Sequence, residues 1–380
     1  MTGAESAVGH SEVEGRQQEL AEKRRRIHKL LEEQGLDAIL ISRHENIAWA
    51  TAGLVDLRVP LLRETGVGSL LITKQGGSYY LTTNNEAPRL AEEEFVGLDY
   101  EPLVQPWYAN DLQASIGKIV GNGKVVADVP TATTASISLQ SLRFELTRSE
   151  VLRYRWLGQH TADAATILLR ALRPGMRETT IQAMLAESLL SRAILPSVYL
   201  TAVDDRIRRY RHAVPRRGVL ERFGMLNFCA RRWGLSVSMT RFVHFGSMPT
   251  ELEDGFSAVA QVNARLLEAT REGITSDELF NVAERAYSAV GYAGEEKQHH
   301  QGGATGYLER EWVARPGGSE RVAALQAFAW NPNLPGAKVE DTFLLLDGSL
   351  ETLTRTPELP VISTRLQGVD YRSAGVLRAE

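Results

Sequence analysis

The sequence predicts two domains of different class, an α/β domain over residues 1–147 and an α+β domain over residues 148–380. Three observations support this division. Single strands alternate with helices in the first third of the chain, helices come in pairs followed by strands in the remainder, and the pattern changes at Thr147-Arg148-Ser149. Alternating strands and helices are typical of α/β folds, whereas grouped helices and strands are typical of α+β folds.

The first predicted element is a helix in which Leu20, Ile27, Leu30 and Leu31 follow helical spacing, and which ends near Gly35. The same spacing places the basic run at 22–26 on a solvated face, so we interpret it as surface rather than as a nucleic-acid patch. Apolar runs then predict strands at 37–42, 68–73, 78–83 and 124–129, with helices at 85–94 and 111–120.

The second domain begins with a long amphipathic helix, for which Ser149 is the predicted N-cap and which stops before Pro174. A second helix follows at 178–193. After two strands, another helix pair is predicted at 252–272 and 276–290. The order helix, helix, strands therefore occurs twice, and we expect an internal duplication in outline.

Composition excludes several classes of protein. With 380 residues, 43% hydrophobic and 24% charged, the chain is long enough for two separate cores. A net charge of -4 argues against nucleic acid or an anionic membrane surface as partner, and the partner we expect is a small-molecule substrate. Cys229 is the single cysteine, so no internal disulfide forms and a cytoplasmic location is expected. No secretory signal and no apolar run of about 20 residues is present, so we expect neither secretion nor membrane insertion.

Four segments resemble, in the correct order, the creatinase and aminopeptidase P family. They are RHAVP at 211–215, MLNFCARRWGLSVSMTRFVHFG at 225–246, HHQGGATGYLERE at 299–311 and AWNPNLPGAKVEDTFLLLDG at 329–348. The first third also resembles the domain that precedes the catalytic domain in this family. The resemblance implies a C-terminal pita-bread domain, an α+β fold with a curved antiparallel sheet, preceded by a smaller α/β domain of creatinase type.

The resemblance also implies positions for metal ligands. Metallopeptidases of the family bind two ions with two Asp, one His and two Glu, and these positions here hold Asn227, Ser238, Gly303, Asn331 and Glu340. One carboxylate cannot hold two divalent cations, and amide or hydroxyl groups are weak substitutes for anionic ligands. We therefore expect no metal and no other cofactor at these positions.

Histidines supply the candidate catalytic groups. Creatinase, a metal-free member of the family, has its general base at the position of His212, and an imidazole with a pKa near ~6.5 can take and return a proton at neutral pH. The arginines around it are expected to lower its pKa and keep it neutral. His299 and His300 are further candidates. As neighbours on a predicted strand they point to opposite faces, so only one is expected to line the site.

Glu340 is expected to orient the substrate or the base. The predicted substrate-binding residues are Arg63, Asn227, Ser238, Arg241, Tyr307, Arg310, Glu311 and Asn331. Of these, Glu311 is expected to pair with Arg310, and Arg241 to hold the sheet or to bind an anionic group. Arg63 resembles an arginine with which creatinase reaches the site of the partner subunit, which implies a homodimer.

Three functions remain open. The first is a metal-independent, creatinase-like enzyme that acts on a C–N bond of a small polar amino-acid-derived metabolite, by hydrolysis or by a related elimination or cyclisation. The second is an inactive pita-bread protein that binds a peptide or a protein partner. The third is an Xaa-Pro-type peptidase with an atypical metal site.

Overall fold

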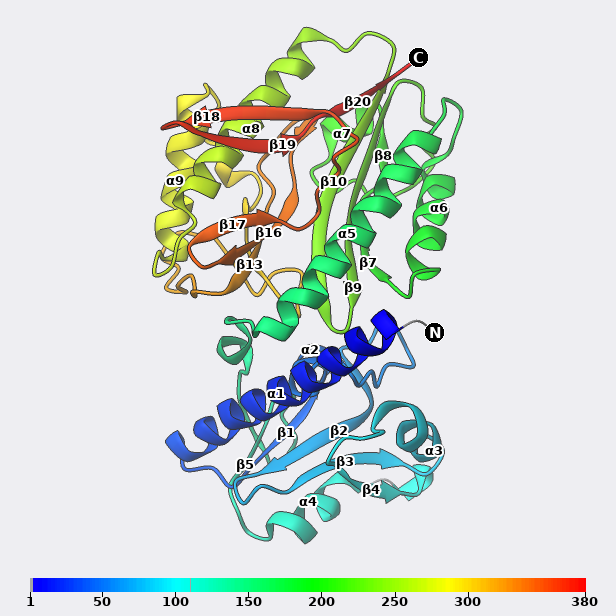
Figure 1. Cartoon of the computed structure of the whole chain (residues 1–380), viewed down its shortest axis with the longest axis vertical. Coiled ribbons are helices and arrows are strands. Elements are labelled where there is room, and N and C mark those ends of the chain that lie inside the picture. The colour runs from blue at the N-terminus through cyan, green and yellow to red at the C-terminus, as the bar shows by residue number, and fades with distance from the viewer. Residues whose placement is uncertain (1–2, 110) are drawn as a thin grey trace. The chain divides into compact units, whose positions relative to one another are not determined.

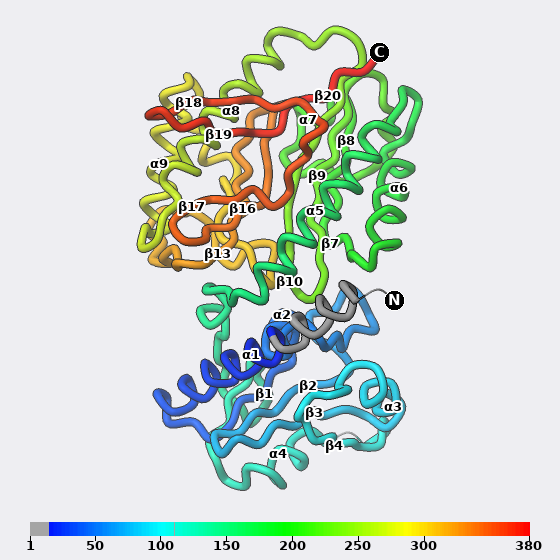
Figure 2. The backbone as a smooth tube through the Cα atoms, viewed as in Figure 1, coloured from blue at the N-terminus to red at the C-terminus, as the bar shows by residue number. Residues whose placement is uncertain are grey.

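The structure is a computed structural model that describes residues 3–109 and 111–380, with side chains from residue 15 onward. Contacts divide the chain into two units. Unit 1 comprises Met1–Arg143 and Thr147–Glu150, and unit 2 comprises Phe144–Leu146 and Val151–Glu380. Figure 2 follows the chain through both. The boundary predicted between residues 147 and 148 falls in the short stretch where the two units alternate along the chain.

Unit 1 is built on a six-stranded mixed sheet in the order β4, β3, β2, β1, β5, β6. The strands are β1 (Ala38–Arg43), β2 (Thr65–Thr73), β3 (Ser78–Thr83), β4 (Glu101–Gln105), β5 (Val125–Ala127) and β6 (Ala135–Ser136). The helices are α1 (Gly3–Glu33), α2 (His44–Ala50), α3 (Ala87–Arg89), continued by a π-helical turn at 90–94, and α4 (Leu112–Val120). Strand β1 lies between antiparallel β2 and parallel β5 and is buried, which explains its apolar run.

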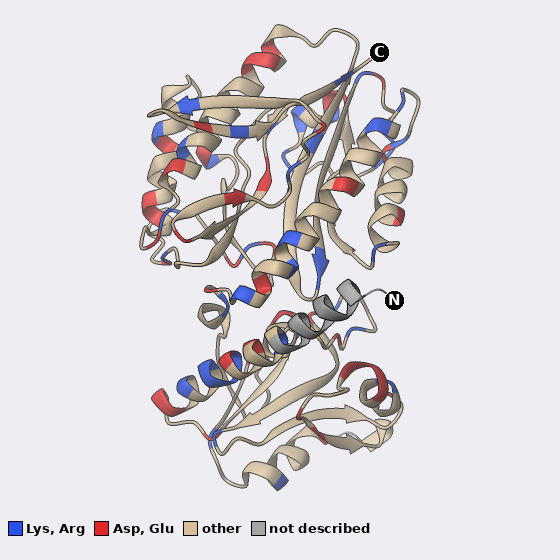
Figure 3. Cartoon of the chain, viewed as in Figure 1, with Lys and Arg blue, Asp and Glu red and all other residues tan. Residues whose placement is uncertain are grey.

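The basic run of α1 is not wholly a solvated face. The side chain of Lys23 is fully buried and forms ion pairs with Glu19 at 2.6 Å and Glu150 at 2.7 Å. Arg26 instead pairs with Glu22 one turn away, as expected for a helix surface. Figure 3 shows the basic and acidic residues interspersed along this helix. The helical spacing predicted the apolar face correctly but placed Lys23 in solvent. A lysine can be buried in a core when it is paired with two carboxylates.

Unit 2 contains two sheets, each preceded by a pair of helices, as predicted. The first pair is α5 (Arg148–Ala171) and α6 (Glu178–Leu190). The first sheet has the order β20, β10, β9, β7, with β8 paired to β9. Its members are β7 (Leu195–Tyr199), β8 (Ala202–Val203), β9 (Phe223–Arg232), β10 (Leu235–Phe245) and β20 (Val376–Ala379), and the short α7 (Asp205–Arg209) follows β8.

The second pair of helices is α8 (Thr250–Ala269) and α9 (Ser276–Ala289). The second sheet has the order β12, β11, β13, β16, β17. Its strands are β11 (Gly302–Thr305), β12 (Trp312–Val313), β13 (Gln326–Trp330), β16 (Asp341–Leu346) and β17 (Ser349–Thr352). Two hairpins complete the unit, β14 (Asn333–Leu334) with β15 (Ala337–Lys338), and β18 (Val361–Leu366) with β19 (Val369–Ala374). Figure 1 shows α6 beside β7, and α8 beside the β18–β19 hairpin.

The two sheets of unit 2 meet where β10 approaches the start of β16. The Thr240 amide donates to the Glu340 carbonyl at 3.1 Å, forming an isolated bridge between the sheets. Strand β10 is buried along its whole length, so its polar side chains need partners inside the protein. Arg241 meets this need through hydrogen bonds to Thr356 and the Thr354 carbonyl and an ion pair with Asp341 at 2.6 Å. This is the sheet-holding role predicted for Arg241.

One of the predicted helix N-caps is wrong. Ser149 is not the N-cap of α5, because Thr147 takes this role in a capping box: its hydroxyl accepts from the Glu150 amide, and the Glu150 carboxylate accepts from the Thr147 amide at 2.6 Å. Asp111 caps α4, where its side chain accepts from the Ala114 amide. None of the described helices is long and apolar enough to span a membrane.

Candidate active site

The centre of the site is the carboxylate of Glu340, which is buried between the two sheets of unit 2. Arg310 Nη2 lies 3.0 Å from one of its oxygens, and Lys338 Nζ lies 3.0 Å from the other. The Thr240 hydroxyl donates to the same carboxylate at 2.7 Å, and so does the side-chain amide of Asn227. Burial alone would raise the pKa of Glu340, but the charges of Lys338 and Arg310 outweigh it and lower the pKa to about 2. Glu340 is therefore ionised at neutral pH and forms ion pairs with two cationic side chains.

Residues from both sheets position this cluster. Asn227 on β9 lies opposite Thr240 on β10, and Ser238 lies one pleat further along the same strand. Ser238 Oγ accepts from Arg310 Nη1 at 3.0 Å and lies 3.1 Å from Cys229 Sγ. The pairing of β9 with β10 thus places the predicted residue Asn227 against Glu340 and Ser238 against Arg310.

The pairing predicted between Arg310 and Glu311 differs from the contact in the structure. Arg310 lies in the segment between β11 and β12, and its guanidinium pairs with Glu340 at 3.0 Å. The Glu311 carboxylate instead accepts from the Tyr307 amide at 3.0 Å. Tyr307 is fully buried, so it supports the core of this segment rather than facing a substrate.

Lys338 is the one member of the cluster that the sequence analysis missed. It lies two residues before Glu340, in the hairpin that leads into β16. Residues two apart in an extended chain point to the same face, so this spacing was the available signal. The cluster of Arg310, Lys338 and Glu340 has a net charge of +1.

The three candidate histidines form one group, which we name the histidine trio: His212, His299 and His300. The Nε2 atoms of His212 and His299 lie 2.8 Å apart, and the rings of His299 and His300 stack with their centroids 4.3 Å apart. The prediction that His299 and His300 point to opposite faces is wrong. They lie in a bend before β11 rather than on a strand, so alternation does not apply to them.

All three imidazoles are held in the neutral form. Burial, followed by the charge of Lys338, lowers the pKa of His212 and brings the pKa of His299 to about 4. Burial, followed by the charge of Arg310, brings the pKa of His300 to about 3. A lowered pKa of His212 was predicted, although the main charges responsible are Lys338 and Arg310 rather than the arginines of its own loop. At pH 7 the trio therefore offers unprotonated ring nitrogens.

Three further positions from the sequence analysis, Asn331, Gly303 and Arg63, have different surroundings. Asn331 is buried after β13, and its side-chain oxygen has no hydrogen-bond partner within the described part of the chain. A buried acceptor of this kind is commonly satisfied by water or a ligand. Gly303 on β11 is packed against β12, where an added Cβ would lie 2.1 Å from the Trp312 carbonyl oxygen. Arg63 is exposed in the segment before β2 of unit 1.

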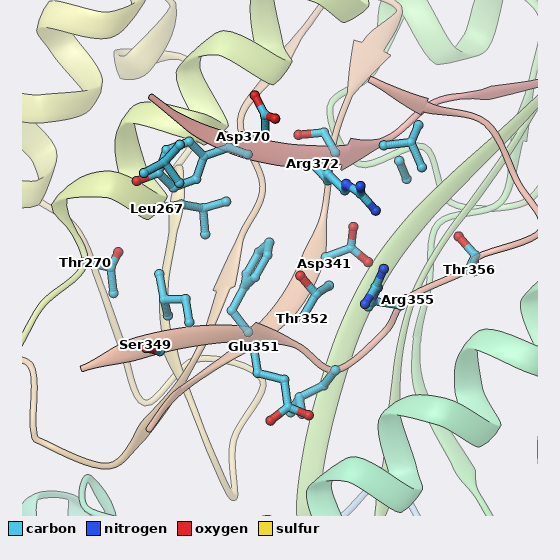
Figure 4. A pocket seen from close by; sticks show the side chains of 18 of the residues that line it. Leu267, Thr270, Asp341, Ser349, Glu351, Thr352, Arg355, Thr356, Asp370 and Arg372 are labelled. Carbon is cyan, nitrogen blue, oxygen red and sulfur yellow. The ribbon is translucent and has the colours of Figure 1, made fainter. Parts of the chain in front are cut away.

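A cleft of about 1140 Å³ lies on the other face of β16. Asp341 and Phe343 line it, whereas Glu340 and Thr342, which alternate with them along the chain, face β10. Figure 4 shows Arg355 near Asp341 in this cleft. Neither the histidine trio nor Glu340 lines it, so this cleft is separate from the candidate active site.

Comparison with known proteins decides the family. The model of metallopeptidase family M24 matches residues 153–346, just over half of the chain, and that of the creatinase/prolidase N-terminal domain matches residues 23–152. The chain belongs to metallopeptidase family M24. The matched family is one of metallopeptidases, so the predicted class of hydrolases that act on C–N bonds is supported.

Individual relatives of this M24 chain are distant. It is 27% identical over 127 residues to an Xaa-Pro dipeptidase from Pyrococcus horikoshii, a match that covers 31% of this chain and only 35% of that protein. An Xaa-Pro dipeptidase structure from Bacillus anthracis has a TM-score of 0.71 at 19% identity, covering 89% of this chain and 98% of that one. Dipeptidase PepE from Mycobacterium ulcerans has a TM-score of 0.73 at 16% identity, covering 95% and 98%. These structures confirm the predicted pita-bread fold with its creatinase-type N-terminal domain.

The comparisons overturn the first of the three predicted functions. A metal-independent, creatinase-like activity is wrong as the main interpretation, because the matched family is one of metallopeptidases and the similar proteins are Xaa-Pro dipeptidases. The neutral residues at the family's ligand positions did not justify the conclusion that the chain binds no metal. Those positions exclude the usual pair of ions in this M24 chain, but they say nothing about an ion bound elsewhere in the site.

The usual ion pair of the family does not fit the residues present. Asn227 and Ser238 are neutral, and at Gly303 the Trp312 carbonyl occupies the space that a histidine Cβ needs. The one remaining carboxylate, Glu340, already carries two cationic side chains. Two divalent cations bound here would be repelled by Arg310 and Lys338, and Glu340 would be the only anion to attract them.

Proposed function

We propose that this chain is an Xaa-Pro-type peptidase that hydrolyses short peptides at an atypical reaction centre, formed by the histidine trio beside the Arg310–Glu340–Lys338 cluster. Membership of family M24 and the similarity to Xaa-Pro dipeptidases support the class of substrate and reaction. The convergence of three neutral imidazoles on one point is the observation that carries the proposal.

The geometry provides the two functions that hydrolysis of an amide needs. A neutral imidazole nitrogen activates water, and the trio has such nitrogens at pH 7 because of its low pKa values. The tetrahedral intermediate carries a negative charge on oxygen, which nearby cations stabilise. Arg310 and Lys338 are held in fixed positions by Glu340 and give the site a net positive charge without any rearrangement during the reaction.

Peptide hydrolysis tests this proposal. The full chain is incubated with a panel of Xaa-Pro dipeptides and matched dipeptides without proline, with and without added Zn²⁺, Co²⁺ or Mn²⁺, and released amino acids are measured by mass spectrometry. His299→Ala is expected to lower turnover by about 10²–10⁴. His160→Ala is the matched control, because His160 lies on α5 with its ring stacked on Trp156 and takes no part in the trio. Equal activity of the two variants, or no hydrolysis of any peptide, contradicts the proposal.

A second candidate function is a binding protein without turnover. The observation in its favour is that four of the five ligand positions of the family are neutral and that the backbone closes around Gly303. Isothermal calorimetry with the same peptides separates the two functions. Saturable binding without any release of amino acids supports the binding protein, whereas turnover that depends on His299 supports the peptidase.

We further propose that the chain works in the cytoplasm as a homodimer in which Arg63 reaches the partner's site. The single buried Cys229 is compatible with a reducing compartment, and Arg63 is exposed and therefore accessible. Light scattering at micromolar concentration tests the dimer. If the protein is a dimer, Arg63→Ala is expected to weaken substrate binding without changing the molar mass, and a monomer of full activity refutes the shared site.

A further inference from the structure

The histidine trio has the composition of a metal site that is not the one used by the family. One ring nitrogen from each of His212, His299 and His300 lies within 4.8 Å of the other two. None of the three occupies a ligand position of the family, which here are Asn227, Ser238, Gly303, Asn331 and Glu340. We propose that the trio binds one divalent transition-metal ion, which leaves a further coordination position open to water. This inference deepens the proposed function, since it concerns the same site.

Side-chain movements bring the distances within the trio, whose three nitrogens lie within 4.8 Å of one another, to those of a metal site. Zinc lies about 2.0–2.1 Å from histidine nitrogens in a tetrahedral site, which places two such nitrogens roughly 3.3 Å apart. The His212 and His299 Nε2 atoms, at 2.8 Å, need to separate by about half an ångström. His212 is exposed and lies in a segment outside the regular elements, so its ring has room to make this movement.

The protonation of His299 already matches that of a ligand. Its Nδ1 lies 2.5 Å from the His300 carbonyl oxygen, which only accepts hydrogen bonds, so Nδ1 carries the proton and Nε2 has the free lone pair. Metal-binding histidines usually have this arrangement, in which the second nitrogen donates to a carbonyl or carboxylate that fixes the tautomer. His299 therefore presents Nε2 toward His212 and the proposed ion.

The neighbouring segment holds this arrangement in place. The Tyr287 hydroxyl donates to the Asn333 carbonyl and to the side-chain oxygen of Gln301, two residues after His299. The His300 ring accepts a long hydrogen bond from the Gly302 amide at 3.3 Å. His299 is thus the best restrained of the three rings, and His212 and His300 are able to adjust to an ion.

The charges near the trio predict which ions bind. The ligand set is neutral, and the neighbouring Arg310–Glu340–Lys338 cluster has a net charge of +1, so a cation gains no help from anionic ligands. Binding therefore depends on the metal–nitrogen bonds. Imidazole ligands favour Zn²⁺, Cu²⁺, Ni²⁺ and Co²⁺ over Mg²⁺ and Mn²⁺, which prefer carboxylate oxygens. The trio is therefore expected to bind Zn²⁺ or Co²⁺ more tightly than Mg²⁺ or Mn²⁺.

Metal titration of the full chain, prepared without a histidine tag, tests the inference. Zn²⁺ binding is measured by isothermal calorimetry, and Co²⁺ binding by its visible absorption, which reports the coordination geometry. The variants His212→Ala and His299→Ala each remove one proposed ligand. Glu340→Gln removes the only carboxylate among the family's ligand positions, Ser238→Ala is a milder change at another of them, and His160→Ala is the histidine control. Circular dichroism establishes which variants fold.

The expected result is one equivalent of Zn²⁺ in the unmodified chain, with affinity reduced more than about tenfold in His212→Ala and His299→Ala and retained in His160→Ala. Ser238→Ala, and Glu340→Gln if it folds, are expected to keep the ion. The inference is overturned if no stoichiometric binding occurs, or if binding survives loss of His212 and His299 but is lost in Ser238→Ala or Glu340→Gln.

These outcomes are separable from those for the proposed function. Peptide hydrolysis that persists with a chelator while no ion binds refutes the metal site and leaves the peptidase in place. An ion bound by the trio without hydrolysis of any peptide refutes the peptidase and leaves the metal site in place.

Discussion

Removing the charge of Glu340 is expected to cost unit 2 a large part of its stability. The buried carboxylate holds Arg310 and Lys338 at 3.0 Å each, and Glu340→Gln leaves both cations without their anion in a place where water is excluded. Breaking one side of a buried ion pair costs about 3–5 kcal/mol. The pKa of Glu340 gives a second route to this figure. Its decrease from an ordinary 4.5 to about 2 corresponds to roughly 3 kcal/mol of stability at neutral pH.

The pH dependence distinguishes this charge effect from a loss of packing. Because the pKa of Glu340 is lower in the folded than in the unfolded chain, its stabilisation is complete above the unfolded value near 4.5 and decreases as the pH falls toward the folded value near 2. The unmodified chain and Glu340→Gln differ in their free energy of unfolding. Relative to neutral pH, integration between the two pKa values predicts that this difference becomes smaller by about 1 kcal/mol at pH 4 and by about 2 kcal/mol at pH 3.

Urea unfolding of the unmodified chain and of Glu340→Gln, followed at pH 7, 5, 4 and 3 with a chelator present, measures both quantities. Glu351→Gln is the matched control. Glu351 pairs with Arg155 at 2.7 Å, but both side chains are more than two-fifths exposed, so its loss is expected to change stability by no more than about 1 kcal/mol. The double variant Glu340→Gln/Lys338→Met is expected to recover part of the loss, since it removes one unpaired cation. A loss below about 1 kcal/mol in Glu340→Gln, independent of pH, refutes the reasoning.

Three further predictions concern the supports of the site. Gly303→Ala is expected to lower the melting temperature by several degrees, because its Cβ would lie 2.1 Å from the Trp312 carbonyl oxygen, and an unchanged melting temperature would show that β12 yields easily. Arg241→Met is expected to destabilise the chain by about 3–5 kcal/mol in urea unfolding, because it leaves the Asp341 carboxylate buried without its partner, and a change below about 1 kcal/mol argues against that pair. Tyr287→Phe removes the hydroxyl that supports the segment after the trio, so the free energy of unfolding is expected to fall by about 1–3 kcal/mol. Zn²⁺ binding measured by calorimetry is expected to weaken as well. If neither value changes, the segment does not depend on this hydroxyl.

The sequence predicted the elements of the fold well where periodicity was strong. The strand at 78–83, the helix capped by Asp111 and the two helix pairs of unit 2 all have clear apolar patterns and end signals. Ser149 was misplaced as an N-cap because Thr147 and Glu150 form the reciprocal capping box two residues earlier. Both are good capping residues, and only the three-dimensional path of the chain decides between them.

For the site, the sequence located the segments but not the interactions between them. It placed His212, His299 and His300 among the candidates, yet their convergence depends on a bend that carries no periodic signal. The partner of Arg310 lies 30 residues away, immediately before β16, so the neighbouring Glu311 was a natural but wrong choice. Long-range pairs of this kind follow from sheet register, which a single sequence does not specify.

The close packing at Gly303 also bears on how this chain can evolve. A mutation that restored the family's histidine there would first have to push the Trp312 carbonyl aside, and it would do so at a place that still lacks three other ligands. Each intermediate would lose stability before any ion could be held, and marginally stable proteins tolerate few such steps. A single substitution at Gly303 therefore does not install the usual metal site of the family. Chemistry in this chain is instead expected to depend on the histidine trio, whose members lie outside those five positions.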